Sequence, residues 1–205
     1  MATAPVVLTV EEGIALVRLA RPPANAIEIS LVEALDATLA RLSEDLPTAV
    51  VLTGAGSVFC AGIDVKVVPG YGREEQRRLI VSINRLIERV YGFPRPTIAA
   101  VNGHAIGGGL VLALACDVRL ATTAACKLGL TEVTAGIPFP AGPITVVRAE
   151  LAPQAPARSR SPATCSIPKR PARSASSTRS HHPRRFSGPR SRRRACSPLA
   201  APTRP

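Results

Sequence analysis

Three consecutive glycines, Gly107, Gly108 and Gly109, constrain what this chain can fold into more than any other feature. A β-branched run at residues 97–101 predicts a buried strand before them, and an apolar run at residues 110–116 predicts a helix after them. Adjacent glycines at a helix start carry an entropic cost, so a plain loop is a poor explanation. The first N–H groups of a helix lack partners within it and lie at the positive end of its dipole. The stretch therefore predicts half of an oxyanion hole, in which N–H groups stabilise an oxygen that becomes negative.

A second glycine-containing loop lies upstream and can supply the other donor. Residues 49–53 predict a short strand, and Phe-Cys-Ala-Gly-Ile-Asp follows at residues 59–64. Asn-Gly-His-Ala-Ile-Gly-Gly-Gly occurs downstream at residues 102–109. In this order and spacing the two motifs resemble the enoyl-CoA hydratase/isomerase (crotonase) superfamily, over about residues 6–152. The resemblance implies an α/β fold, the crotonase-like spiral of ββα units, with residues 1–152 forming an acyl-CoA-binding core.

The resemblance also implies where an acyl-CoA thioester binds. It assigns the backbone N–H groups of Ile63 and Gly108 to the thioester carbonyl oxygen, where they stabilise an enolate. The substrate-binding positions that it implies are Ala26, Ala61, Gly62, Asp64, Lys66, Gly107, Gly109 and Val111. For Lys66 a contact with a CoA phosphate and a solvated side chain are both open, whereas Asp64 is expected to brace its own loop. Residues 21–27 either run along the CoA or form a rigid turn.

Glu132 is the expected catalytic base. Hydratases of this family carry two glutamates, and the resemblance implies that the first would stand at Val111 and the second at Glu132. Addition of water requires both activation and orientation of that water, whereas one carboxylate in an apolar pocket can move a proton between two carbons. The sequence around Glu132 also resembles the single-glutamate Δ3,Δ2-enoyl-CoA isomerases. Double-bond isomerisation is therefore preferred over hydration or another crotonase reaction, and a capping or ion-paired role for Glu132 remains the structural alternative.

The other elements follow from hydrophobic spacing and turn chemistry. Ser30 and Glu33 have the spacing of a capping box, and leucines on one face follow them, which predicts a helix that starts at Ser30. His104 has no Ser or Cys partner for a triad, so a structural loop histidine is expected. The remaining elements are a hairpin of strands at residues 6–10 and 14–19, a helix at 73–91, strands at 117–121 and 127–130, and a last helix at 144–151.

The basic charge of the chain is concentrated at its C-terminal end. The net charge of +12 divides into −1 over residues 1–150 and +13 over residues 151–205, which contain no acidic residue. The second segment also holds ten of the 20 prolines and shows no apolar periodicity. Such a composition cannot bury a core, so residues 153–205 are expected to form a disordered tail rich in Arg, Pro and Ser.

Two accounts of this tail compete. One choice of codons for residues 161–180, read one base earlier, gives a segment ending Ala-x-x-x-Gly-Leu-Val-Asp, which resembles the C-terminal part of the crotonase family. A frame slip near residues 151–156 would leave a truncated core and would remove the homotrimer or hexamer that the resemblance implies. The alternative is a nucleic-acid-binding protein with a basic arm, which predicts selective binding through residues 158–194. The frame slip is preferred, and sequencing the gene across codons 145–165 distinguishes the two accounts.

Composition excludes some other classes. No stretch is long and apolar enough to span a membrane, and the N-terminal residues lack the pattern of a signal peptide, so a cytoplasmic location is expected. The cysteines lack metal-ligand spacing, which favours free thiols and no metal site. No separate cofactor is expected, because the resemblance makes coenzyme A part of the substrate.

Overall fold

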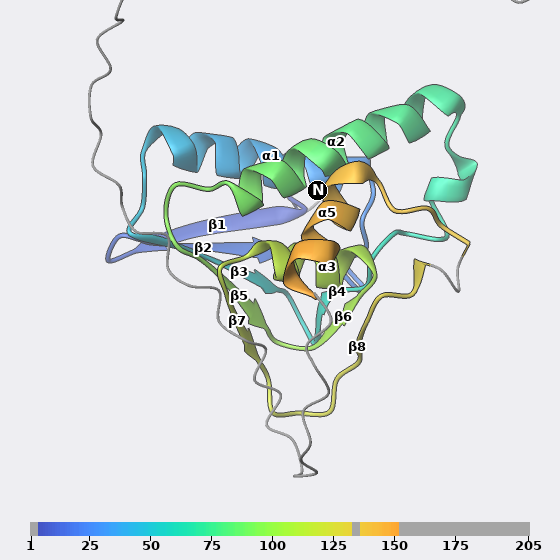
Figure 1. Ribbon diagram of the computed structural model, residues 1–205. Helices are drawn as coiled ribbons and strands as arrows, with labels where there is room; N and C mark the ends of the chain where they lie inside the picture. The colour runs from blue at the N-terminus through green and yellow to red at the C-terminus, as the bar shows by residue number, and fades with distance from the viewer. Residues whose placement is uncertain (1–3, 133–135, 152–205) are drawn as a thin grey trace, which may run out of the picture. The chain divides into compact units, whose positions relative to one another are not determined.

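The computed structural model describes residues 4–132 and 136–151 of the 205-residue chain. Within this part, strands form two sheets, and four helices pack beside them in the arrangement of Figure 1. The expected α/β fold is therefore confirmed. The tail predicted at residues 153–205 lies outside the described residues, and its boundary with the core stays a prediction.

The larger sheet has five strands in the order β1-β2-β3-β5-β7. These are β1 (Val6–Glu11), β2 (Ile14–Leu19), β3 (Ala49–Gly54), β5 (Thr97–Val101) and β7 (Val118–Ala121). The first two form the expected antiparallel hairpin, whose turn has positive φ at Glu12 (50°) and Gly13 (78°). That geometry matches the right-handed twist of the two strands. The other pairs are parallel, which requires crossover connections through helices or a second sheet.

The smaller sheet has three short parallel strands in the order β4-β6-β8. These are β4 (Val58–Cys60), β6 (His104–Ile106) and β8 (Leu128–Gly129). Each of the successive pairs β3–β4, β5–β6 and β7–β8 gives one strand to each sheet. The first two pairs are followed by helices α2 (Arg73–Tyr91) and α3 (Gly108–Ala115). This repetition is the spiral of ββα units that the sequence predicts.

Two further helices, α1 (Ile29–Glu44) and α5 (Ala141–Glu150), complete the helical layer. Helices α1 and α2 run beside each other, and α5 contacts both α2 and α3 (Figure 1). A three-residue 3-10 helix, η1 (Val68–Gly70), precedes α2. Helix α3 is apolar on all sides, and most of its residues are buried, as expected for a helix at the centre of the core.

The predicted capping of α1 is wrong. The residue that caps this helix is Glu28, whose carboxylate accepts hydrogen bonds from the N–H groups of Ser30 (3.0 Å) and Leu31 (3.1 Å). Ser30 lies inside the first turn, and Glu33 pairs with Arg78 of α2 instead. A carboxylate at a helix N-terminus satisfies free N–H groups and is favoured by the dipole, so Glu28 displaces the local capping box.

Candidate active site

The first candidate donor, Ile63, lies in an extended segment beside the loop that precedes α1. Ile27 forms an isolated parallel bridge with Ile63, in which Ile27 N–H donates to Gly62 O (2.7 Å) and Asp64 N–H donates to Ile27 O (2.9 Å). In a parallel pair of this kind, the flanking groups face the neighbouring strand, and the central N–H points the other way. The N–H of Ile63 is thus directed away from Ile27, and it donates to no other described residue.

The second candidate donor, Gly108, begins α3, where N–H groups have no partner within the helix. Gly107 caps this helix with φ 54° and ψ −125°, a conformation that favours glycine. A Cβ at Gly109 would lie 2.2 Å from Cys60 O, so only glycine lets α3 approach β4 this closely. A Cβ at Gly62 would lie 3.4 Å from Gly108 N, which shows that the backbone before Ile63 runs beside the start of α3.

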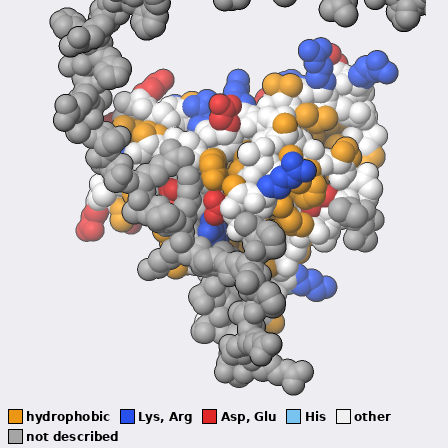
Figure 2. Space-filling view, in the orientation of Figure 1, with side chains coloured by type: hydrophobic (Ala, Val, Ile, Leu, Met, Phe, Trp, Pro, Cys, Tyr) orange, Lys and Arg blue, Asp and Glu red, His pale blue; other side chains and the backbone are white. Residues whose placement is uncertain are grey.

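An apolar cavity of about 370 Å³ lies at these two loops. Its walls include Ile63, Gly108, Val111 and Glu132, together with side chains of α1 and α2 such as Leu35 and Leu86. In Figure 2, hydrophobic side chains also reach the surface in groups on the face that carries α2 and α5, below an edge with several Lys and Arg side chains. The lining of the cavity therefore suits an apolar chain.

Among the described residues, Glu132 provides the only carboxylate that lines this cavity. It is 8 % exposed, and its Oε2 is buried without a hydrogen-bond partner in the described part of the chain. A Cβ at Gly107 would lie 2.8 Å from Glu132 Oε1, so the carboxylate rests against the backbone that precedes Gly108. Of the described side chains none forms an ion pair with it. This arrangement fits a proton acceptor rather than a structural ion pair.

Val111 stands on α3 one turn after Gly107, to whose carbonyl its N–H donates (3.1 Å). Its side chain is 1 % exposed and lines the cavity beside Glu132. The position at which the resemblance implies the first hydratase glutamate therefore carries an apolar group at the same cavity. The structure thus brings together four of the predicted site residues: Ile63, Gly108, Val111 and Glu132.

The other predicted substrate-binding residues do not line the cavity. Asp64 braces its loop as expected, because its Oδ1 accepts from the N–H groups of Lys66 (3.0 Å) and Val67 (3.2 Å). The Lys66 side chain is exposed. Ala61 N–H donates to a neighbouring carbonyl, and Ala26 O accepts from an arginine. Gly62, Gly107 and Gly109 act through close backbone approach, and CoA contacts for all of these residues stay predictions.

Two other reactive side chains near the site are accounted for structurally. Cys60 lines the cavity, but complete burial raises the pKa of its thiol to about 12, so it remains protonated at neutral pH. The Nδ1 atom of His104 accepts a hydrogen bond from Lys127 N–H (2.8 Å), which confirms the expected structural histidine. In the ranges 4–132 and 136–151, no group of three or more His, Cys, Asp or Glu side chains could hold a metal ion.

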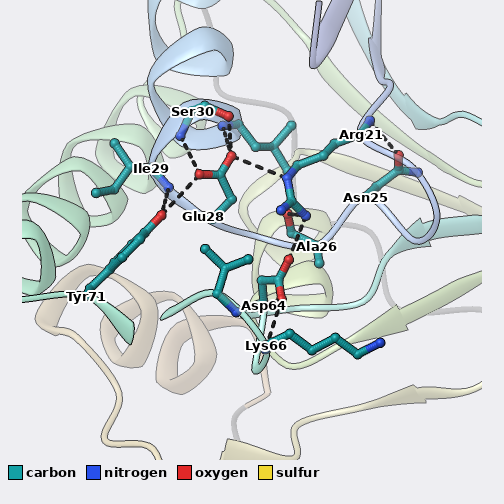
Figure 3. Close-up of polar contacts among 11 residues, drawn as sticks. Arg21, Asn25, Ala26, Glu28, Ile29, Ser30, Asp64, Lys66 and Tyr71 are labelled. Carbon is teal, nitrogen blue, oxygen red and sulfur yellow. Dashed lines mark hydrogen bonds and ion pairs between the residues drawn. The ribbon is translucent and has the colours of Figure 1, made fainter. Parts of the chain in front are cut away.

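A polar network next to Ile63 was not predicted from the sequence. Arg21 forms ion pairs with Glu28 (3.3 Å) and Asp64 (2.8 Å), and Tyr71 donates to Glu28 (3.1 Å; Figure 3). Its members come from three separate loops, so no local motif marks it. An arginine directly before a Pro-Pro pair was the only available signal, and it is not specific.

Comparison with known proteins finds the family that the two motifs resemble. The family model described as enoyl-CoA hydratase/isomerase matches residues 9–159. A Bacillus subtilis protein described as a probable enoyl-CoA hydratase is 39 % identical over 132 residues, which are 63 % of this chain and 51 % of that protein. The human enoyl-CoA hydratase domain-containing protein 2, mitochondrial, is 42 % identical over 130 residues, or 62 % of this chain and 44 % of that protein. The chain therefore spans about half the length of the curated relatives it matches.

Solved structures share the fold. The enoyl-CoA hydratase of Bacillus anthracis matches with a TM-score of 0.66 and 36 % sequence identity, over 71 % of this chain and 58 % of that chain. No helix in the described part of this chain is both long and apolar enough to cross a membrane. The expected cytoplasmic location stays a prediction, since the name of the human relative places that protein in mitochondria.

Proposed function

Because this chain belongs to the enoyl-CoA hydratase/isomerase family, we propose that it acts on enoyl-CoA thioesters and moves a double bond with Glu132 as its single base. The observation that carries this proposal is the pairing of Glu132 with Val111 at one apolar cavity. Glu132 offers a buried carboxylate oxygen without a described hydrogen-bond partner, and Val111 offers no second carboxylate.

The proposed reaction starts from a 3-enoyl-CoA. Glu132 removes a proton from C2, the carbon between the carbonyl and the double bond, and the electron pair moves into the thioester carbonyl. The N–H groups of Ile63 and Gly108 stabilise the resulting dienolate oxygen, a type of interaction in which each donor contributes roughly 3 kcal/mol. Glu132 then returns the proton to C4 as the carbonyl re-forms. The product is the 2-enoyl-CoA isomer, and no atom is gained or lost.

Hydration is the alternative that the names of the relatives favour. Water addition needs a water molecule held and activated beside C3 of the substrate, and in this cavity Val111 occupies the position at which the resemblance implies the first of two glutamates. An apolar wall gives a water molecule few hydrogen-bond partners. The cavity chemistry therefore supports proton transfer better than water addition. Coenzyme A would be part of the substrate, so no separate cofactor is proposed, and a trimer or hexamer remains a prediction.

The test compares the 205-residue chain with Glu132→Gln. Both proteins are incubated with 3-enoyl-CoA, the isomers are separated by chromatography, and binding of a saturated acyl-CoA is measured by calorimetry. The glutamine has nearly the same shape but cannot accept the proton, so we expect at least a hundredfold loss of isomerisation with nearly unchanged binding.

Glu33→Gln is the matched control, because Glu33 lies on α1 and pairs with Arg78 outside the cavity. This control should retain both binding and turnover. Unchanged turnover in Glu132→Gln would remove Glu132 from the mechanism.

A further inference from the structure

Arg21 links the two chain segments that meet at the Ile63 bridge. Its Nη1 lies 3.2 Å from Ala26 O in one segment and 2.8 Å from Asp64 Oδ2 in the other (Figure 3). Its Nε lies 3.3 Å from Glu28 Oε1. The Arg21 side chain is 22 % exposed, so these charge-assisted contacts are only partly open to solvent. One side chain therefore connects both segments at a single point.

The partners of Arg21 are themselves fixed. Glu28 caps α1. It also accepts a hydrogen bond (3.1 Å) from the hydroxyl of Tyr71, a residue that lies just before α2 in the chain. Burial opposes ionisation of Glu28, but the hydrogen bonds from Ser30, Leu31 and Tyr71 outweigh it and lower its pKa. The carboxylate that faces Arg21 thus remains charged at neutral pH and is held to two helices.

Asp64 is held equally firmly. Burial opposes its ionisation, but hydrogen bonds from Lys66 N–H and Val67 N–H, together with the Arg21 guanidinium, lower its pKa. Because Asp64 directly follows Ile63, a fixed Asp64 leaves the Ile63 peptide little freedom to rotate. The hydrogen bond from Ile27 N–H to Gly62 O holds the Gly62–Ile63 peptide, which carries the Ile63 N–H, and the bond from Asp64 N–H to Ile27 O holds the next peptide.

From these contacts we propose that Arg21 is a positioning residue, which holds the Ile63 N–H in the direction of the thioester oxygen. The inference rests on the proposed function, since it assumes that Ile63 is an oxyanion donor. Arg21 itself does not line the cavity and acts through Asp64. Without Arg21, Glu28 and Asp64 lose the cation that both carboxylates share, and the segment that contains Ile63 is released from the segment that contains Ala26.

The experiment uses the full chain and three variants. Arg21→Ala removes the link. Arg21→Lys keeps the charge, but lysine lacks the planar guanidinium that contacts the oxygens of Ala26, Glu28 and Asp64 together. Arg78→Ala is the matched control, since Arg78 also pairs with a glutamate at the start of α1 but lies outside the cavity and the network. The probe is hexanoyl-CoA carrying a labelled thioester carbonyl, whose stretching frequency in infrared difference spectra falls when an oxyanion hole polarises it.

For the wild type and Arg78→Ala we expect the same red shift of the carbonyl band. Arg21→Ala should lose most of that shift, and Arg21→Lys should fall between them. The isomerisation kcat of Arg21→Ala should fall about tenfold with a much smaller change in KM, because a slightly misdirected donor weakens the transition state more than binding. If Arg21 were merely structural, Arg21→Ala would reduce the folded fraction, measured by circular dichroism. The carbonyl band of the ligand bound to the remaining folded molecules would keep its wild-type frequency.

Failure of this inference and failure of the proposed function are distinguishable. A wild-type red shift that persists in Arg21→Ala overturns the positioning role alone. A wild-type chain that gives no red shift contradicts the oxyanion hole, and hydrogen exchange then decides whether Arg21 still fixes the segment. Faster exchange of the Ile27 and Asp64 amides in Arg21→Ala than in Arg78→Ala would support that fixation, and equal exchange would overturn it.

Discussion

Gly107→Ala is a sensitive perturbation of the catalytic base, because a Cβ at this position would lie 2.8 Å from Glu132 Oε1. Ordinary contacts between such atoms are near 3.5 Å, so the carboxylate must move by roughly 0.7 Å. That movement is cheap for stability, since the end of a flexible side chain can turn aside. It is costly for proton transfer: if a displacement of 1 Å costs about a hundredfold, one of roughly 0.7 Å should cost about 25-fold.

Backbone strain adds a separate cost. Gly107 has φ 54° and ψ −125°, and an alanine in such a conformation loses about 1–3 kcal/mol of stability. Gly56→Ala is the matched control, because Gly56 also has positive φ (73°) but a Cβ there would meet nothing within 4 Å. The two variants should therefore both lose stability, and Gly107→Ala alone should lose activity per folded molecule.

Urea denaturation gives the stability of each variant, and formation of the conjugated 2-enoyl-CoA, followed by its ultraviolet absorbance, gives the activity. Activity is divided by the folded fraction, so that strain and carboxylate displacement are separated. If Gly107→Ala keeps wild-type activity per folded molecule, the carboxylate does not need its observed place against Gly107, and the geometric argument for Glu132 fails.

Three further predictions concern charge and burial. Folding lowers the pKa of Glu28 from 4.5 and that of Asp64 from 3.8. The two ionised carboxylates therefore stabilise the folded chain fully above those unfolded-state values, and this contribution is lost as the pH falls through the lower folded-state pKa values. Urea midpoints measured from about pH 6 to about pH 2 should show this loss, and Arg21→Ala should reduce it. Val111→Glu should lower stability by about 3–5 kcal/mol in urea titrations, because it places an unpaired carboxylate in the core. Iodoacetamide at neutral pH should label the partly exposed Cys126 but leave the buried Cys60 unlabelled until urea is added, as peptide mapping would show.

Long elements with strong periodicity could be predicted from the sequence alone. The expected helix at residues 73–91 coincides with α2, and the expected strand at residues 97–101 coincides with β5. Strand β6 was not predicted, because its three residues pair with β4 and β8, which are distant in sequence. In the same way, Glu28 replaced the expected cap because its carboxylate is fixed by Arg21 of the same loop and by Tyr71, which is distant in sequence.

The candidate site also combines residues that local sequence motifs indicate with residues that only the three-dimensional contacts reveal. The glycine run and the Phe-Cys-Ala-Gly-Ile-Asp motif led, through the family resemblance, to Ile63 and Gly108, because backbone donors at turns leave a recognisable glycine pattern. Glu132 was assigned from the resemblance alone. The Arg21 network leaves no such pattern, since the contacts that involve Asp64 and Tyr71 depend on how separate loops approach one another in three dimensions. The four residues that line the cavity could therefore be proposed from the sequence, whereas the contacts that surround them required the structure.

The central claim is that one carboxylate at an apolar cavity moves a proton and does not add water. The most direct test incubates the 205-residue chain with 3-enoyl-CoA in oxygen-labelled water and identifies the first product by mass spectrometry. The account predicts 2-enoyl-CoA with the mass of the substrate and without labelled oxygen. Rapid appearance of a labelled 3-hydroxyacyl-CoA, formed from the 2-enoyl-CoA while Val111 is in place, would contradict it.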